Sequence, residues 1–313
     1  MKLKLLLRFL GPAIFIFILF VYVDLKELAK ILTILKWPFF LMSLVFIPPL
    51  LVFRSNRWRN ILIKYGIFYS RWQCFRIYFI EMVAIMLVAT VGTFAKVFYL
   101  QRDGYGLKHS LLTILVDKYY DYTLPLIFGC TSVFLAWAQI RPGFGLLIFT
   151  TATCLAFFPV RKAVWLLSPR MLPKNLNAMF IKRGLNIQEH LAQIYKALNF
   201  KIYLYSVAAF LIYFLSIYFL TVGLRIELGF FQVILIMTIT SLVAMIPVSF
   251  LGIGTRDAGL IAVFKWFGHS PEQAIALSMA LLLLRVAIVL MGSIFWLADP
   301  PPLNELKKLK ENK

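Results

Sequence analysis

Two short stretches of the sequence place ionisable residues among apolar ones. The first, "LVDKYYDYTL", carries Asp117 and Asp121, which are four residues apart and therefore share one face of a helix. The second, "GTRDAGL", carries Arg256. A charged side chain in hydrocarbon costs about 2.5–3.5 kcal/mol, so such residues are expected to pair or to bind a polar ligand. We expect the two aspartates to pair across a helical bundle with Lys96, Arg256 or Arg285.

The longer stretch "PVSFLGIGTRDAGL" (247–260) surrounds this arginine with helix breakers, which are Pro247, Gly252, Gly254 and Gly259. Glycines permit a tight turn and expose backbone N–H groups where a helix restarts, and a helix N-terminus beside an arginine forms a phosphate site. We therefore expect Arg256 to face a phosphate and Asp257 to hold it in place. A nucleotide loop is excluded, because the third glycine or alanine and the βαβ surroundings of a dinucleotide turn are missing.

Arg285 has no carboxylate close to it in sequence, so we expect its partner to be a tertiary contact or a lipid phosphate, which arginine binds through bidentate hydrogen bonds. The two aspartates allow a second interpretation, as base or metal ligands of a membrane-embedded transferase, although no DxD or DDxxD motif is present. Three cysteines without CxxC spacing and three histidines without HExxH predict no metal site and no cofactor. We expect no catalytic residue.

Composition places the whole chain in a membrane. Of 313 residues, 62% are hydrophobic and only 15% are charged, and the mean hydropathy is +0.85. The formal net charge of +20 comes from basic residues that cluster at the ends of apolar stretches, which is typical of plasma-membrane topology rather than of nucleic-acid binding. The basic N-terminus lacks a cleavage site and predicts an uncleaved first span.

The apolar segments predict an all-α polytopic protein with about six to eight transmembrane helices. They cover residues 9–23, 37–53, 75–100, 122–139, 143–160, 201–223, 231–251 and 271–297. An amphipathic stretch at 24–36 predicts an interfacial helix. We expect one membrane domain over 1–313, with an N-terminal half (1–160), a basic linker (161–200), a C-terminal half (201–300) and a basic tail (301–313).

The basic segments 54–76 and 161–201 and the tail are predicted to be cytoplasmic, as are both termini. Three apolar segments separate each consecutive pair of these markers, and three crossings cannot return a chain to the side it left. Either the span count is off by one in each half, or one segment in each half re-enters the membrane. The segments with breakers and charge, 87–106 with Gly92 and 244–260, are the candidates for re-entrant segments lining a polar space.

These two regions also resemble each other, which predicts a two-fold internal repeat. "GTFAKVFYLQRDGYG" (92–106) and "GTRDAGLIAVFKWFG" (254–268) begin with Gly-Thr, end with Gly after the same interval and are followed by a His-Ser pair. Interrupted segments at corresponding positions of two halves are typical of transporters.

Three motifs resemble the flippase-like membrane domain of the lysylphosphatidylglycerol synthases, which also occurs in stand-alone proteins. They are "RWRNILIKYG" (57–66), "VGTFAKVFYLQRDGYGLKHSLLTILVDKYYD" (91–121) and "IPVSFLGIGTRDAGLIAVF" (246–264). Leu251 stands where the family has a glycine and Asp257 where it has a glutamate, and the proline usual before Gly92 is absent. The resemblance covers most of the chain and implies a polytopic bundle that binds or moves anionic lipids. It also implies that Lys96, Asp117, Arg256 and Asp257 lie at the cavity.

We therefore expect an integral protein of the plasma membrane that binds and flips lipids with an anionic or phosphate-bearing headgroup. The alternatives are a non-catalytic membrane partner of envelope-biosynthesis proteins and a lipid-linked transferase. In relatives that make aminoacylated lipid, the transferase chemistry lies in an appended soluble domain. This chain ends soon after its last apolar segment, so we expect that domain to be missing and the protein not to be an enzyme.

Overall fold

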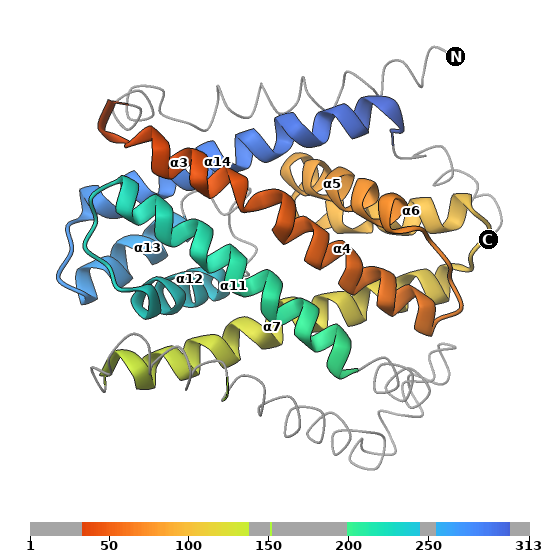
Figure 1. Cartoon of the computed structure of the whole chain (residues 1–313), viewed down its shortest axis with the longest axis horizontal. Helices are drawn as coiled ribbons and strands as arrows, with labels where there is room; N and C mark the ends of the chain where they lie inside the picture. The colour runs from red at the N-terminus through yellow and green to blue at the C-terminus, as the bar shows by residue number, and fades with distance from the viewer. Residues whose placement is uncertain (1–32, 138–150, 152–198, 245–254, 301–313) are drawn as a thin grey trace.

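The computed structural model describes residues 33–137, 199–244 and 255–300, together with residue 151 (Figure 1). The regular elements in these ranges are all helical, which confirms the predicted fold class. They are α3 (Trp37–Val45), α4 (Ile47–Lys64), α5 (Arg71–Val88), the 3₁₀ segment η1 (Ala89–Phe94), α6 (Ala95–Arg102), α7 (Leu107–Trp137), α11 (Phe200–Gly223), α12 (Phe230–Ala244), α13 (Thr255–Trp266) and α14 (Pro271–Ala298).

Within the described ranges, three helical stretches are long and apolar enough to cross a membrane: 37–64, which joins α3 to α4, then α11 and α14. The predicted spans 9–23 and 143–160 and the breakers Pro247, Gly252 and Gly254 lie outside the described residues.

The centre of the molecule is an antiparallel crossing of α3–α4 with α11 (Figure 1). Ser43 donates a hydrogen bond to the carbonyl of Ser216 at 2.8 Å, and Ser216 donates one to the carbonyl of Ser43 at 3.0 Å. Farther along, the amide of Lys36 bonds the carbonyl of Gly223. Small residues at such contacts let helix backbones approach closely in a membrane. This antiparallel pairing defines two ends of the molecule. We call the end where α11 finishes the Gly223 end, and α4 finishes at the opposite end.

The first half contains a hairpin that starts and finishes at the same end. Gly92 lies so close to Ala84 that a Cβ at this glycine would stand 2.2 Å from the carbonyl carbon of Ala84, so the chain reverses after α5. The return helix α6 brings Asp103 back beside Tyr69, whose hydroxyl donates to the Asp103 carboxylate at 2.6 Å. Burial and this hydrogen bond raise the pKa of Tyr69. At eight residues, or about 12 Å, α6 is too short to cross a bilayer.

The second half repeats the arrangement at the Gly223 end. Helix α13 packs against α12, with Gly259 in contact with Val243, and it runs back toward the end from which α12 starts (Figure 1). The two helices have 15 and 12 residues, about 22 and 18 Å, against a hydrocarbon core of about 30 Å. Helix α14 then crosses to the other end, where Asp299 pairs with Arg76 at 3.0 Å and Arg102 at 2.8 Å. We call this end the Asp299 end.

The turns of the two halves correspond residue by residue. Six residues join α4 to α5 and α11 to α12, and the second of them, Gly66 or Arg225, has a positive φ of 74° or 57°. Four residues join α6 to α7 and α13 to α14, and here the positive φ belongs to Gly104 and Gly268. Each turn closes a helix with an amide bonded to a carbonyl five residues earlier, the bond that defines a Schellman motif.

The two halves therefore form an inverted repeat, with hairpins at opposite ends. The predicted repeat was shifted by two residues, because it aligned Gly106 rather than Gly104 with Gly268. The long helix of each half also packs against the hairpin of the other half: α7 packs against α12, and α14 packs against α5. A glycine lies at each contact: a Cβ on Gly129 would stand 2.7 Å from Thr238, and one on Gly292 would stand 2.7 Å from Val83.

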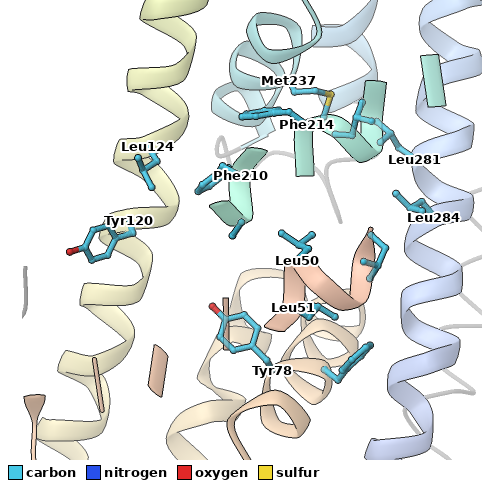
Figure 2. Close-up of a cluster of buried hydrophobic side chains, with 14 of the residues drawn as sticks. Leu50, Leu51, Tyr78, Tyr120, Leu124, Phe210, Phe214, Met237, Leu281 and Leu284 are labelled. Atoms are coloured by element: carbon cyan, nitrogen blue, oxygen red, sulfur yellow. The ribbon is translucent and has the colours of Figure 1, made fainter. Parts of the chain in front are cut away.

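An apolar core fills the space between the halves (Figure 2). It joins side chains from α4, α5, α7, α11, α12 and α14, among them Leu50, Leu51, Tyr78, Tyr120, Leu124, Phe210, Phe214, Met237, Leu281 and Leu284. Large aromatic side chains are exposed at both ends, Trp72 and Phe68 at the Asp299 end and Trp37 and Trp266 at the Gly223 end. Such belts are typical of the two interfaces of a membrane.

Two boundaries differ from the predicted ones. The span predicted at 122–139 belongs to α7, which begins at Leu107 and so carries Asp117 and Asp121 within one continuous helix. The basic segment predicted as a loop from residue 54 continues α4 as far as Lys64, and Arg57 in it is fully buried. The charges of Arg57, Asp117 and Asp121 pair with each other, so these residues avoid the free-energy cost of an unpaired charge in a membrane. The predicted boundaries were wrong because they included that cost.

Candidate functional site

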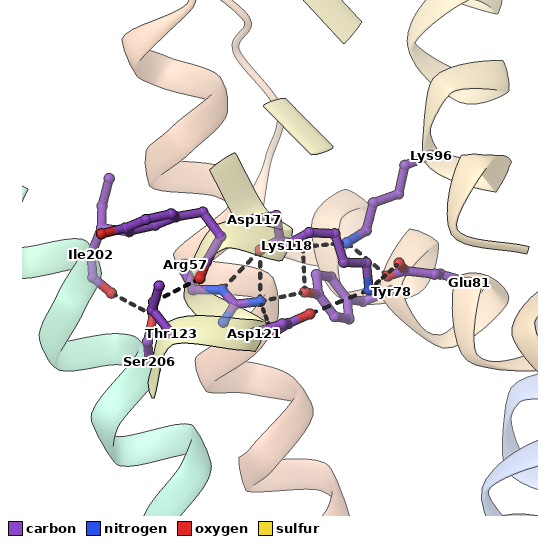
Figure 3. Close-up of polar contacts among 11 residues, drawn as sticks. Arg57, Tyr78, Glu81, Lys96, Asp117, Lys118, Asp121, Thr123, Ile202 and Ser206 are labelled. Atoms are coloured by element: carbon purple, nitrogen blue, oxygen red, sulfur yellow. Dashed lines mark hydrogen bonds and ion pairs between the residues drawn. The ribbon is translucent and has the colours of Figure 1, made fainter. Parts of the chain in front are cut away.

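The first polar site is a closed ring of alternating charges in the first half (Figure 3). We call it the charge ring, and its members in order are Arg57, Asp117, Lys96, Glu81, Lys118 and Asp121. They come from α4, α5, α6 and α7, so the ring ties the whole first half together. The helical spacing of Asp117 and Asp121 turns both carboxylates toward α4.

Asp117 is the most heavily bonded member of the ring. Its Oδ1 accepts from Nε of Arg57 at 2.8 Å, and its Oδ2 accepts from the Tyr78 hydroxyl at 2.7 Å and from Lys96 at 2.8 Å. Arg57 also bonds Asp121 through Nη2 at 2.7 Å. The side chains of Arg57 and Lys96 are 0% exposed and that of Asp117 is 1% exposed. In such surroundings each hydrogen bond to a charged group is strong.

Glu81 and Lys118 close the ring on its other side. Glu81 lies 2.7 Å from the ammonium group of Lys96 and 3.9 Å from that of Lys118, which in turn lies 3.3 Å from Asp121. The Lys96 ammonium also lies 3.5 Å from the centre of the Tyr78 ring, a cation–π distance. Three cations and three anions give the ring a formal net charge of zero. Because its charges are balanced internally, the ring is suited to hold helices together rather than to attract an anion.

Arg57 is a buried member of the charge ring that was not predicted from the sequence, because it was counted among cytoplasmic loop charges. A signal was present in the sequence. Leu50, Leu51, Trp58, Ile61 and Leu62 repeat at helical spacing through this segment and place Arg57 on their buried face. Glu81 was noted as a charge within a span, but its pairing with Lys96 was not predicted.

The second polar site lies in the other half, and we call it the arginine site. It consists of Arg256 and Asp257 in the first turn of α13 and of Ser278 and Arg285 on α14. Nη2 of Arg256 donates to the Ser278 hydroxyl at 2.7 Å and lies 3.4 Å from the Asp257 carboxylate, to which the Ser278 hydroxyl donates in turn. The side chain of Arg256 is only 5% exposed.

Two nitrogens of Arg256, Nε and Nη1, are buried and have no hydrogen-bond partner among the residues that the structure describes. They carry three of the five N–H donors of a guanidinium group. A buried donor without an acceptor costs about 1–3 kcal/mol, so an acceptor placed beside these two nitrogens would stabilise the site. For comparison, Arg57 directs both Nε and Nη2 at carboxylates, and within the described ranges only its Nη1 has no partner.

Arg285 adds a second positive charge to the arginine site. It lies at the middle of α14, two helical turns after Ser278 and therefore on the same face, and its charge is repelled by that of Arg256 and attracted by that of Asp257. Two arginines and one aspartate leave this site with a formal net charge of +1. The first-turn N–H groups of α13 have no acceptor within their own helix, which favours an anion at the same place.

The structure separates residues that the sequence analysis grouped. Lys96, Asp117 and Asp121 lie in the charge ring, whereas Arg256, Asp257 and Arg285 lie in the arginine site. Of the partners proposed for the two aspartates, Lys96 is the one that makes contact. Gly259 lies inside α13 and provides a close packing contact with Val243 rather than a turn. Ser278, which no sequence motif indicated, connects the charges of the arginine site.

The family of the chain follows from a comparison with known proteins. A family model described as "Lysylphosphatidylglycerol synthase TM region" matches residues 6–294, nearly the whole chain. No curated protein and no solved structure matches the chain. Together with the apolar helices and the inverted repeat, this match agrees with the resemblance carried by the motifs around Lys96 and Arg256. The chain belongs to the family of the lysylphosphatidylglycerol synthase transmembrane region, a family of membrane domains.

Proposed function

We propose that the protein binds lipids with an anionic or phosphate-bearing headgroup at the arginine site and moves them across the plasma membrane. The observation that carries this proposal is the buried guanidinium of Arg256, which has a second arginine nearby and two nitrogens without a hydrogen-bond partner in the described part of the chain. A phosphate supplies both the acceptors and the negative charge that these groups lack.

The architecture supports transport rather than binding alone. Inverted repeats with interrupted helices are the framework of many transporters, whose substrate sites lie near the middle of the membrane where the repeats meet. Arg256 starts the second limb of such a hairpin, and Arg285 is near the midpoint of the 28-residue α14. A headgroup held there is about halfway between the two membrane surfaces.

The proposal assigns no bond-making step to this chain. The arginine site offers cationic donors and one hydroxyl, and in the charge ring each carboxylate is held by a cation. Among the described residues, no group of histidine, cysteine or acidic side chains could hold a metal ion.

The charge distribution supports an orientation in which the Asp299 end faces the cytoplasm. Basic residues at that end include Lys64, Arg71, Arg76, Arg102, Lys108 and Lys201, against Lys36, Arg225 and Lys265 at the Gly223 end. An excess of lysine and arginine is typical of the cytoplasmic side. Helix α14 finishes at the Asp299 end, so in this orientation the C-terminus of α14 faces the cytoplasm.

A vesicle assay tests the proposal. Purified protein is reconstituted into phosphatidylcholine vesicles that contain fluorescent phosphatidylglycerol, and the movement of the probe between leaflets is followed by quenching from outside. Wild type is expected to move the probe faster than protein-free vesicles. Arg256→Ala is expected to slow it by about tenfold or more, since hydrogen bonds to charged groups contribute about 1.5–3 kcal/mol.

Lys265→Ala, an exposed change on the same helix, is the matched control and is expected to behave as wild type. Wild-type protein that moves the probe no faster than empty vesicles would contradict the proposal. In that case, a stoichiometric protein that co-purifies with the chain would favour the alternative of an envelope-biosynthesis partner.

A further inference from the structure

Ser278 is a buried hydroxyl between two charged groups. Its side chain projects from the second turn of α14, and the residue is 2% exposed. The hydroxyl accepts a hydrogen bond from Nη2 of Arg256 at 2.7 Å and donates its own proton to Oδ1 of Asp257. It therefore uses both its acceptor and its donor capacity within the arginine site.

The hydroxyl takes the position that a carboxylate occupies beside the buried arginine of the first half. Arg57 lies 2.7 Å from Asp117 and 2.7 Å from Asp121. Arg256 has its short contact with neutral Ser278, and its only carboxylate in the described structure, Asp257, is at 3.4 Å. The neutral Ser278 hydroxyl lies between Arg256 and the Asp257 carboxylate. It orients the guanidinium by a hydrogen bond, whereas the carboxylate is too far away to neutralise the guanidinium by a close ion pair.

We infer that Ser278 is a positioning residue, which holds Arg256 so that Nε and Nη1 are presented to the phosphate of a lipid. Ser278 itself does not touch the ligand. Because Ser278 and Arg285 are seven residues apart on α14, fixing Arg256 on Ser278 also places it beside the second arginine of the same helix face. This inference rests on the proposed function.

Without the hydroxyl, Nη2 of Arg256 loses its best acceptor and turns to Asp257, its immediate neighbour in sequence. A direct ion pair between these two residues removes positive charge from the site and withdraws donors from the ligand. The expected consequence is weaker binding of phosphate, with little change in the movement of a headgroup that has bound.

The test measures the initial rate of fluorescent phosphatidylglycerol movement at increasing mole fractions of the probe in phosphatidylcholine vesicles. Ser278→Ala is expected to raise the half-saturating mole fraction about tenfold and to leave the maximal rate within about twofold of wild type. Ser293→Ala is the matched control, because among the described residues its hydroxyl bonds only the Val289 carbonyl of the same helix. The control is expected to behave as wild type.

Two further variants separate positioning from packing. Ser278→Thr keeps the hydroxyl and is expected to retain the wild-type half-saturation within about twofold. In an Arg256→Lys background, Ser278→Ala is expected to have less than about a third of its effect on wild type, since it acts through the guanidinium. The inference is overturned if Ser278→Ala matches wild type, if the threonine variant shifts as far as alanine, or if the effect is undiminished in the lysine background. Failure of wild type to move lipid contradicts the proposed function instead.

Discussion

The two halves of the molecule share one fold and differ in how they treat a buried arginine. In the first half, Arg57 lies between two aspartates and belongs to a ring whose charges cancel. In the second half, Arg256 lies against a serine, and a second arginine raises the local charge to +1. The backbones of the two halves match turn by turn, so the difference lies in side chains.

We infer from this difference that the two repeats have different roles. A buried charge network that is complete fixes the relative positions of its helices, whereas one that lacks an anion is completed by a ligand. Under the proposed function, the first half therefore provides a stable frame, and the second half provides the binding site. Substitutions at equivalent places should affect stability in the first half and lipid handling in the second.

The largest effect is expected from Arg57→Ala. It leaves Asp117 and Asp121 buried without their shared partner, which costs about 3–5 kcal/mol for a broken buried ion pair. The variant should unfold at a much lower temperature in detergent or fail to accumulate as a monodisperse protein. Lys64→Ala, at the exposed end of the same helix, should match wild type. A normal melting temperature for Arg57→Ala would show that the charge ring does not hold the first half together.

Valine at the two interhelical glycines is expected to destabilise both halves alike. Gly129→Val and Gly292→Val each place a side chain within 2.7 Å of a neighbouring helix, and such overpacking costs about 1–3 kcal/mol. Thermal unfolding of each variant measures the loss. The controls are Cys130→Val and Ile294→Val, exposed positions on the same helices. Losses that differ by more than about twofold would argue against equivalent contacts in the two repeats.

Arg285→Gln is expected to impair lipid movement but not folding. Removing this charge relieves repulsion with Arg256 and also loses attraction to Asp257, so the melting temperature should change little. The rate of fluorescent phosphatidylglycerol movement should fall by about tenfold, which corresponds to losing one charge-assisted contact of about 1.4 kcal/mol. A variant that unfolds as readily as Arg57→Ala would place Arg285 in the structural framework and weaken the contrast between the halves.

The smallest effect is expected at the left-handed turns. Gly66→Ala puts a Cβ on a residue with φ of 74° and should cost about 1 kcal/mol, although the added atom meets no neighbour within 4 Å. Arg225→Gly removes the same strain at φ of 57°. Once the conformational-entropy cost of glycine is subtracted, the free energy of unfolding should rise by about 0.5 kcal/mol. Opposite shifts in melting temperature would support the equivalence of the turns, and shifts of the same sign would contradict it.

Much of the fold could be predicted from the sequence, because breakers and charges are costly in a membrane. The interruption near Gly92, the break before α13 and the helices at 201–223 and 271–297 all left clear patterns in the sequence. The inverted relation of the halves could not be predicted, since it depends on which helix faces meet. Ser43 and Ser216, which fix that relation, are ordinary small residues in apolar stretches.

The candidate site was predicted only in part for a similar reason. Arg256, Asp257 and Arg285 were recognised as charges in apolar surroundings, and the structure brings them together around Ser278. Arg57 was misplaced because it lies near the end of a span, where a basic residue usually faces water. Sequence shows that a charge is present, but only tertiary packing shows whether a carboxylate or a hydroxyl lies beside it.

The paired serines at the central crossing have a consequence for how the protein is made. All charge-ring residues lie between 57 and 121, so all of them have been synthesised once α7 is complete, whereas the partner of Ser43 comes 173 residues later. During that interval its hydroxyl has another acceptor, the Phe39 carbonyl of its own helix at 3.0 Å. Until α11 has been inserted and packs against α3, the Ser43 hydroxyl can therefore stay hydrogen-bonded inside the bilayer through a carbonyl of its own helix.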